Sequence, residues 1–342
     1  MSISASDLFL SADLTEEEAR QFLQTFGFTD PAAADERLQA LADELAVRQA
    51  LADLASLLLE AIRETPDPDG ALAAFVHFTG TRSPRAGFLR YLREDPRALH
   101  VLIQVTGTSP FLGELLIASP EQFHWLVREV DRTPPDLWDL TSDAMHRLAE
   151  AANPDARRTA LRHFHDRELL RIGTREILGR ETAESTRAQL ADLNEVVIGR
   201  ALAIAREIVE ATPARLGEIE GRFVVIASDP AASAQAELIY VYDCEDGVEA
   251  LAAAHYDALA RALTDVLSER VNGRPLQAVR HPAWFTDDGA TTSARAFHAL
   301  RQQLAASPST DGATRAFLVK SRLVAGDRAL GQAVQGLTEP RV

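Results

Sequence analysis

The feature that most constrains the fold is a long succession of helix signals, which runs from about residue 15 to residue 211. Between residues 32 and 64, for example, leucines recur at the spacing of one face of a helix. Capping residues mark several helix starts: Thr15 precedes three glutamates, and Ser109 and Ser119 each precede a proline at the first helical position. A break is expected near Gly179. These signals predict an array of α-helices.

The pattern changes at Gly221. Residues 222–227 (RFVVIA) and 236–243 (AELIYVYD) are short apolar, β-branched runs, which are typical of buried strands. Residues 248–270 have the pattern of an amphipathic helix, residues 276–280 that of a third strand, and residues 293–305 that of another helix. The predicted fold class is therefore α+β and mostly α, with a helical array domain at 1–215 and a mixed α/β domain at 216–342.

Composition excludes several kinds of protein. The 342 residues carry a net charge of −16, from 35 basic and 51 acidic residues, so we expect no nucleic-acid partner. The single cysteine, Cys244, excludes an intramolecular disulfide and a cysteine-based zinc site. No apolar run is long enough to cross a membrane, and the start does not read as a secretory signal. We therefore expect a cytoplasmic protein with no membrane partner.

A strand, a tight turn and a second strand ending in acids form the ground plan of a nucleotidyltransferase. Such enzymes hold two Mg²⁺ ions with carboxylates at alternate positions of one strand, because residues i and i+2 point to the same face. A third carboxylate comes from a neighbouring strand, and the metals then hold the attacking and leaving oxygens. This chemistry is expected where residues 222–227 and 236–243 meet.

Four segments occur in an order and spacing that span most of the chain: FGFTDP (26–31), TSPFLGELLI (108–117), RELLRIGTREILG (167–179) and KSRLVAGDRALG (320–331). Together they resemble the glutamine synthetase adenylyltransferase/adenylyl-removing enzyme family, in its N-terminal, deadenylylating half. The resemblance implies a helical domain followed by a nucleotidyltransferase-like core, with glutamine synthetase as a partner. It stops at Val342, so we expect the helical tail of that half and the whole second half to be absent.

The chain departs from the family pattern at the acids. The family's two metal-binding aspartates fall on Gln235 and Glu237, and its third acid falls near Gln277. A neutral amide is a poor Mg²⁺ ligand, so most of the charge that holds two divalent ions is lost. Ser228 and Arg280 stay as candidate nucleotide-binding residues, and Glu237 as the candidate metal ligand.

The family's glycine-rich loop is also replaced. The corresponding residues 227–234 (ASDPAASA) contain no glycine, so backbone amides are less able to approach a phosphate. Asp229 in this stretch is a possible displaced ligand, but an Asp-Pro pair is more readily explained as a turn. Glu237 has a similar second explanation, as a polar residue on the exposed face of its strand.

Two functions follow. The first is a catalytically degenerate relative that acts as a binding or regulatory module in nitrogen metabolism. It needs no cofactor, and its partner is glutamine synthetase or another regulatory protein. The alternative is an active nucleotidyltransferase that uses displaced ligands such as Asp229 and Glu237, with Mg²⁺ and ATP or ADP. The arginines between residues 157 and 175 are interpreted as members of surface ion pairs, because acids are interspersed among them.

Overall fold

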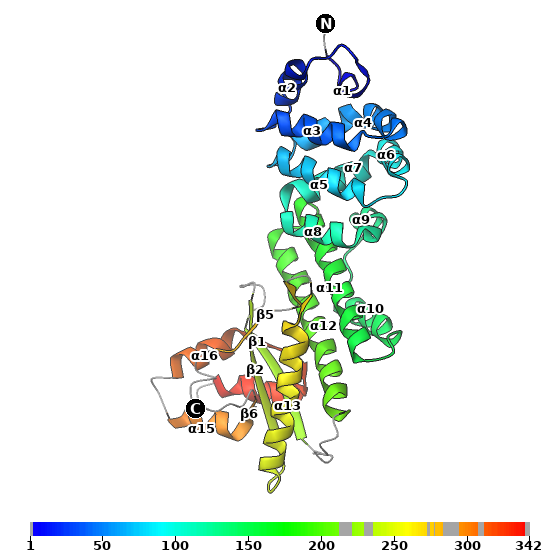
Figure 1. Ribbon diagram of the computed structural model, residues 1–342. Helices are drawn as coiled ribbons and strands as arrows, with labels where there is room; N and C mark the ends of the chain where they lie inside the picture. Colours follow the sequence, from blue (N-terminus) through cyan, green and yellow to red (C-terminus); the bar gives the residue numbers. More distant parts are fainter. Residues whose placement is uncertain are drawn as a thin grey trace. The chain divides into compact units, whose positions relative to one another are not determined.

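The computed structural model describes residues 3–211, 221–228, 235–271, 274–276, 278–282, 294–306 and 311–338 (Figure 1). The chain is α+β and mostly helical, as predicted. It forms two compact units, Met1–Thr133 with Asp166–Thr186 and Pro134–His165 with Arg187–Val342. The predicted boundary between residues 215 and 216 lies outside the described residues, so it stays a prediction.

The first unit is an array of helices. Its elements are α1 (Asp7–Leu10), α2 (Glu16–Gln24), α3 (Pro31–Leu41), α4 (Leu45–Arg63), α5 (Pro68–Gly80), α6 (Arg85–Glu94), α7 (Pro96–Thr108), α8 (Pro110–Ala118), a 3₁₀ turn (Pro120–Gln122) and α9 (Phe123–Glu129). The long helices α11 (Pro154–Ile177) and α12 (Ala183–Glu210) contribute residues to both units. They are separated near Gly179, whose φ is +64°, as predicted.

Local capping explains most of these helix starts. Thr15 forms a capping box with Glu18, and the Ser109 hydroxyl accepts a hydrogen bond from the Leu112 amide at 3.3 Å. Both caps were predicted. The cap predicted at Ser119 is wrong, because residues 120–122 form a 3₁₀ turn first and the Ser119 side chain makes no capping hydrogen bond.

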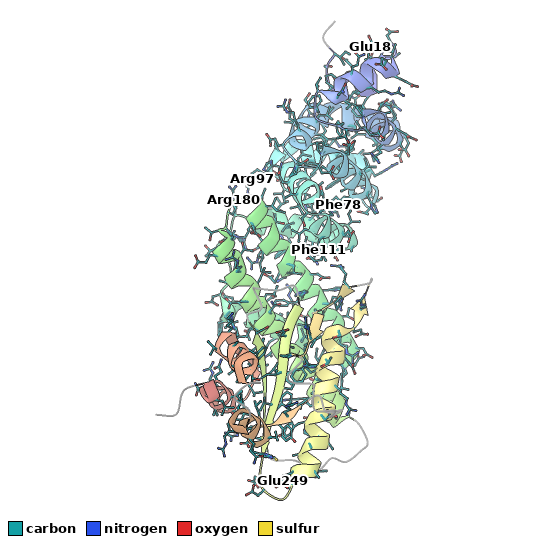
Figure 2. The ribbon with its side chains drawn as sticks, turned by 90° about the vertical axis from the view of Figure 1, so that its left-hand side faces the viewer. Glu18, Phe78, Arg97, Phe111, Arg180 and Glu249 are labelled. Carbon is teal, nitrogen blue, oxygen red and sulfur yellow. The ribbon has the colours of Figure 1, made fainter. Side chains whose placement is uncertain are left out.

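Aromatic residues fill the centre of this unit. The ring centroids of Phe78 and Phe123 lie 5.4 Å apart, and those of Phe78 and Phe88 lie 5.7 Å apart, both with edge-on geometry. At the surface Arg97 and Arg180 both pair with Asp131, and Figure 2 shows the two arginines close together. Residues far apart in sequence are thereby tied into one array.

The interpretation of the arginines at 157–175 as surface ion pairs is wrong for part of the set. Glu168 and Arg171 have side chains 3% exposed and form an ion pair at 2.7 Å. Arg175 is also buried and pairs with Glu181 at 2.7 Å. Helical spacing shows which residues share a face but not what packs on it, and here the packing buries the charges.

The second unit is built on a mixed sheet of five strands: β1 (Gly221–Ser228), β2 (Gln235–Cys244), β5 (Ala278–Arg280), β6 (Arg295–Ala296) and β7 (Ser321–Gly326). The order is β5-β2-β1-β7. β6 also pairs with β2, at a later part of that strand than β5 does. β1 is antiparallel to β2 and β7, whereas β5 and β6 are parallel to β2. A separate two-stranded ladder joins β3 (Arg270–Val271) to β4 (Arg274–Pro275).

Helices complete this unit: α10 (Leu137–Ala149), α13 (Glu249–Ser268), α15 (Phe297–Ala306), α16 (Asp311–Lys320) and α17 (Arg328–Gln335). The strands at 222–227 and 236–243 and the helix at 248–270 are confirmed as β1, β2 and α13. The helix predicted at 293–305 starts later than expected, because residues 295 and 296 pair with β2 as a strand.

The sheet is covered on both faces. On one face Ile226 and Ile239 join an apolar core with residues of α15, α16 and α17. On the other face Phe223 stacks on Tyr256 of α13, with ring centroids 5.7 Å apart. Figure 1 shows α13 on one side of the strands and α15 and α16 on the other. No helix in the described part of the chain has the length and apolar character needed to cross a membrane.

Candidate functional site

A row of polar residues crosses the sheet where β1 ends and β2 begins. Ser321 of β7 pairs with Ser228 of β1, and Glu237 of β2 pairs with Arg280 of β5. Leu238 pairs with Ala227, so the antiparallel register brings Glu237 opposite Ser228. The structure therefore brings together three of the residues predicted from sequence, namely Ser228, Glu237 and Arg280.

The charged pair in this row defines its chemistry. The Glu237 Oε1 atom lies 3.7 Å from the Arg280 Nε atom, with side chains 35% and 63% exposed. Glu237 points to the same face as Ile239 and is half-buried, at the border of the apolar core. A guanidinium thus lies beside the carboxylate that the sequence analysis predicts as the candidate metal ligand.

For three other predicted residues the structure does not describe the side chain. Asp229 and Gln277 lie outside the described residues. The backbone of Gln235 pairs with Ala278, two residues along the ladder from the Glu237 pair, but its side chain is not described. Within the described residues there is no group of three or more His, Cys, Asp or Glu residues that could hold a metal ion.

The histidine next to this row supports the sheet. The His281 ring nitrogen Nδ1 lies 2.7 Å from the carbonyl oxygen of Leu238, and the ring meets Tyr240 edge-on at 5.2 Å. These contacts hold the end of β5 against β2. They match the structural role that a lone histidine at this position suggests.

The family-like segment at 320–331 builds a corner of the sheet. Gly326 has φ +96°, a conformation that favours glycine. The Asp327 amide donates to the Phe223 carbonyl at 2.8 Å, and the Asp327 side chain accepts from the Leu330 amide at 2.7 Å, which caps α17. This segment therefore positions β7 and α17 against β1.

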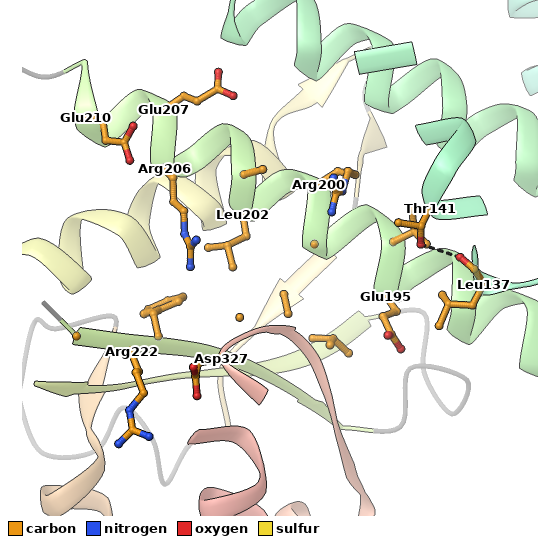
Figure 3. Close-up of a pocket in the computed structure, with 18 residues that line it drawn as sticks. Leu137, Thr141, Glu195, Arg200, Leu202, Arg206, Glu207, Glu210, Arg222 and Asp327 are labelled. Atoms are coloured by element: carbon orange, nitrogen blue, oxygen red, sulfur yellow. Dashed lines mark hydrogen bonds between the residues drawn. The ribbon is translucent and has the colours of Figure 1, made fainter. Parts of the chain in front are cut away.

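Sequence reasoning missed a cavity of about 750 Å³ at the other end of β1 (Figure 3). Its lining comes from α10, α12, the start of β1 and the end of β7. These segments lie far apart in the chain, so no local motif marks the cavity.

A helical array followed by a mixed sheet is the organisation that the sequence resemblance implied. Comparison with known proteins identifies the family. Residues 99–279 match the family described as glutamate-ammonia ligase adenylyltransferase. The chain belongs to this family.

Similar full-length proteins carry the name bifunctional glutamine synthetase adenylyltransferase/adenylyl-removing enzyme. The Leifsonia xyli protein is 29% identical over 267 residues, covering 75% of this chain and 25% of its own length. The Corynebacterium efficiens protein is 27% identical over 250 residues, covering 69% and 23%. The Xanthobacter autotrophicus protein is 29% identical over 303 residues, covering 80% and 30%. The chain thus spans between 23% and 30% of the length of these relatives.

Proposed function

We propose that this chain is a catalytically degenerate member of the family and acts as a binding or regulatory module in nitrogen metabolism. The observation that carries this proposal is the ion pair between Glu237 and Arg280. A two-metal site needs several carboxylates close together, each with an oxygen available to the metals. Here one carboxylate of the candidate site already has a guanidinium beside it.

The retained scaffold supports a binding role. The segment at 320–331 keeps the left-handed glycine and the helix cap that join β7 to β1, and the helical unit keeps its caps and its aromatic core. Loss of catalytic acids with preservation of the fold is the pattern expected of a protein that is selected for binding. The relatives are named for their action on glutamine synthetase, so glutamine synthetase is the proposed partner.

The alternative is an active nucleotidyltransferase that adds or removes an adenylyl group with displaced ligands. The observation in its favour is that Glu237 keeps a partly exposed carboxylate at a family ligand position. In this case Asp229 and Glu237 would hold Mg²⁺, and ATP or ADP would bind between Ser228 and Arg280.

The two functions differ in turnover. Purified chain is mixed with glutamine synthetase and labelled ATP, or with adenylylated glutamine synthetase and phosphate, and the adenylyl content is measured by intact mass. Binding is followed in parallel by biolayer interferometry. Glu237→Gln removes the carboxylate, and Glu245→Gln is a matched control at an exposed position of the same unit.

The proposal predicts no turnover by the unmodified chain and equal binding of glutamine synthetase by all three proteins. Turnover that is lost in Glu237→Gln but kept in Glu245→Gln would establish the alternative. Absence of binding to glutamine synthetase in either form would refute the proposed partner.

A further inference from the structure

The cavity missed by sequence reasoning has two chambers, both within the second unit. The larger, of about 750 Å³, lies between α12 and the β1–β7 corner. The smaller, of about 220 Å³, shares Arg206, Glu210 and Phe223 with it and reaches His255 and Tyr256 on α13. The larger volume is in the range of small-molecule sites, and the smaller one is below it.

Most charged groups of the lining are already paired. Glu207 pairs with Arg157, Glu195 with Arg322, and Arg222 with Asp243. The Asp327 carboxylate caps α17. The charges in these groups are therefore balanced inside the unit and leave little net field in the cavity.

Two arginines differ from this pattern. Within the described residues, Arg200 and Arg206 form neither a hydrogen bond nor an ion pair. Both line the larger chamber, where Arg200 is half-buried and Arg206 is exposed. Figure 3 shows the Arg206 guanidinium on the side of α12 that faces the strands, whereas Glu207 points away from the strands. Six residues of helix separate the two positions by about 9 Å along the axis. Glu210, the acid of the lining that forms no such pair, is exposed near the end of α12.

Two buried nitrogens in the same region lack a hydrogen-bond partner. They are the Nε atom of Arg200 and the Nδ1 atom of His255. Buried polar atoms in folded proteins are nearly always hydrogen-bonded, so an unmatched one needs an explanation, such as strain, a water or an ion. Arg200 lines the larger chamber and His255 lines the smaller one.

We propose that this double cavity binds a small organic anion that carries a phosphate or carboxylate group and a flat aromatic ring. The anionic group lies between Arg200 and Arg206, since guanidinium groups bind such oxygens with charge-assisted hydrogen bonds. The ring enters the smaller chamber beside the stacked rings of Phe223 and Tyr256.

This site is separate from the polar row. Gly221 lines the cavity and Ser228 belongs to the row, so the two lie at opposite ends of β1. Eight residues of strand span about 23 Å. A ligand here does not reach the family's acid positions, which makes it a regulator of the module and not a substrate.

Calorimetry on the full chain tests the site with two probes, AMP as the phosphate and phenylpyruvate as the carboxylate. We expect at least one to bind with a Kd of about 1 mM or tighter. Arg200→Gln and Arg206→Gln each weaken that binding about tenfold or more, the effect of losing one charge-assisted hydrogen bond. Arg187→Gln is the matched control, because Arg187 is an exposed arginine of the same helix outside the lining of both chambers, and it leaves the affinity unchanged.

A third variant guards against loss of fold. Ala203 is exposed on α12 and lines the cavity, so Ala203→Glu adds a repelling carboxylate in a helix-favouring residue. It abolishes binding while thermal unfolding stays unchanged. The proposal is refuted if neither probe binds, or if Ala203→Glu and Arg206→Gln bind as well as the unmodified chain. It is also refuted if Arg280→Gln abolishes binding, since the ligand then lies at the polar row.

Discussion

Substitution of Gly326 by alanine should lower the free energy of unfolding of the second unit by more than the left-handed backbone conformation alone explains. Gly326 has φ +96°, and a left-handed alanine costs about 1–2 kcal/mol. A Cβ atom there would also overlap the Phe223 carbonyl and lie 2.8 Å from the Val224 Cα atom. These are backbone atoms of β1, so the strands must separate, at a further cost of about 1–3 kcal/mol. The expected loss is about 2–5 kcal/mol.

Two other glycines isolate the two contributions. Gly247 has φ +94° with no atom within 4 Å of its added Cβ, so Gly247→Ala should lose only about 1–2 kcal/mol. Gly336 has φ −62° and equally open space, so Gly336→Ala should be neutral or slightly stabilising.

The assay is urea unfolding of the three variants, followed by circular dichroism, with amide hydrogen exchange in β1 as a local measure. We expect faster exchange in β1 for Gly326→Ala alone. Equal losses in Gly326→Ala and Gly247→Ala would refute the reasoning, because the close approach of β7 to β1 would then contribute nothing.

Three further changes test other parts of the account. Asp327→Ala removes the cap of α17 and should cost about 1 kcal/mol in urea unfolding, whereas Asp327→Asn should keep most of it. Arg175→Met removes the buried guanidinium that pairs with Glu181 and should cost about 3–5 kcal/mol, and adding Glu181→Leu should restore part of the loss. Burial lowers the pKa of His255 below its usual 6.5, so the unfolded chain binds a proton more readily than the folded chain does. The free energy of unfolding should therefore fall as the pH drops below 6.5, and it should fall less steeply in His255→Gln. Urea midpoints measured at pH 7.5 and 5.5 would show both effects.

Local chemistry explains which parts of the fold the sequence predicts. Thr15 and Ser109 act on amides within the next few residues, so their capping roles can be read from the chain. Residues 222–227 and 236–243 are short apolar, β-branched runs, which are typical of strands and uncommon in helices and loops. The cap predicted at Ser119 was wrong because the choice between a 3₁₀ turn and an α-helix depends on how the turn packs.

The candidate site depends on contacts between residues that lie far apart in the sequence, so local sequence does not predict them. Glu237 and Arg280 were each candidates, but their ion pair follows from the parallel register of β2 and β5. Arg200 and Arg206 were not singled out, because an arginine on a helix is usually solvated and only the fold shows which ones face a cavity. Arg171 was expected at the surface for the same reason.

Titration calorimetry of the chain with ATP, in the presence and absence of Mg²⁺, tests catalytic degeneracy most directly. With Arg280 beside Glu237, we predict that Mg²⁺ neither creates nor strengthens ATP binding, and that Glu237→Gln behaves like the unmodified chain. Micromolar ATP binding that requires Mg²⁺ and disappears in Glu237→Gln would contradict the account, because it would show that Glu237 still holds a catalytic metal.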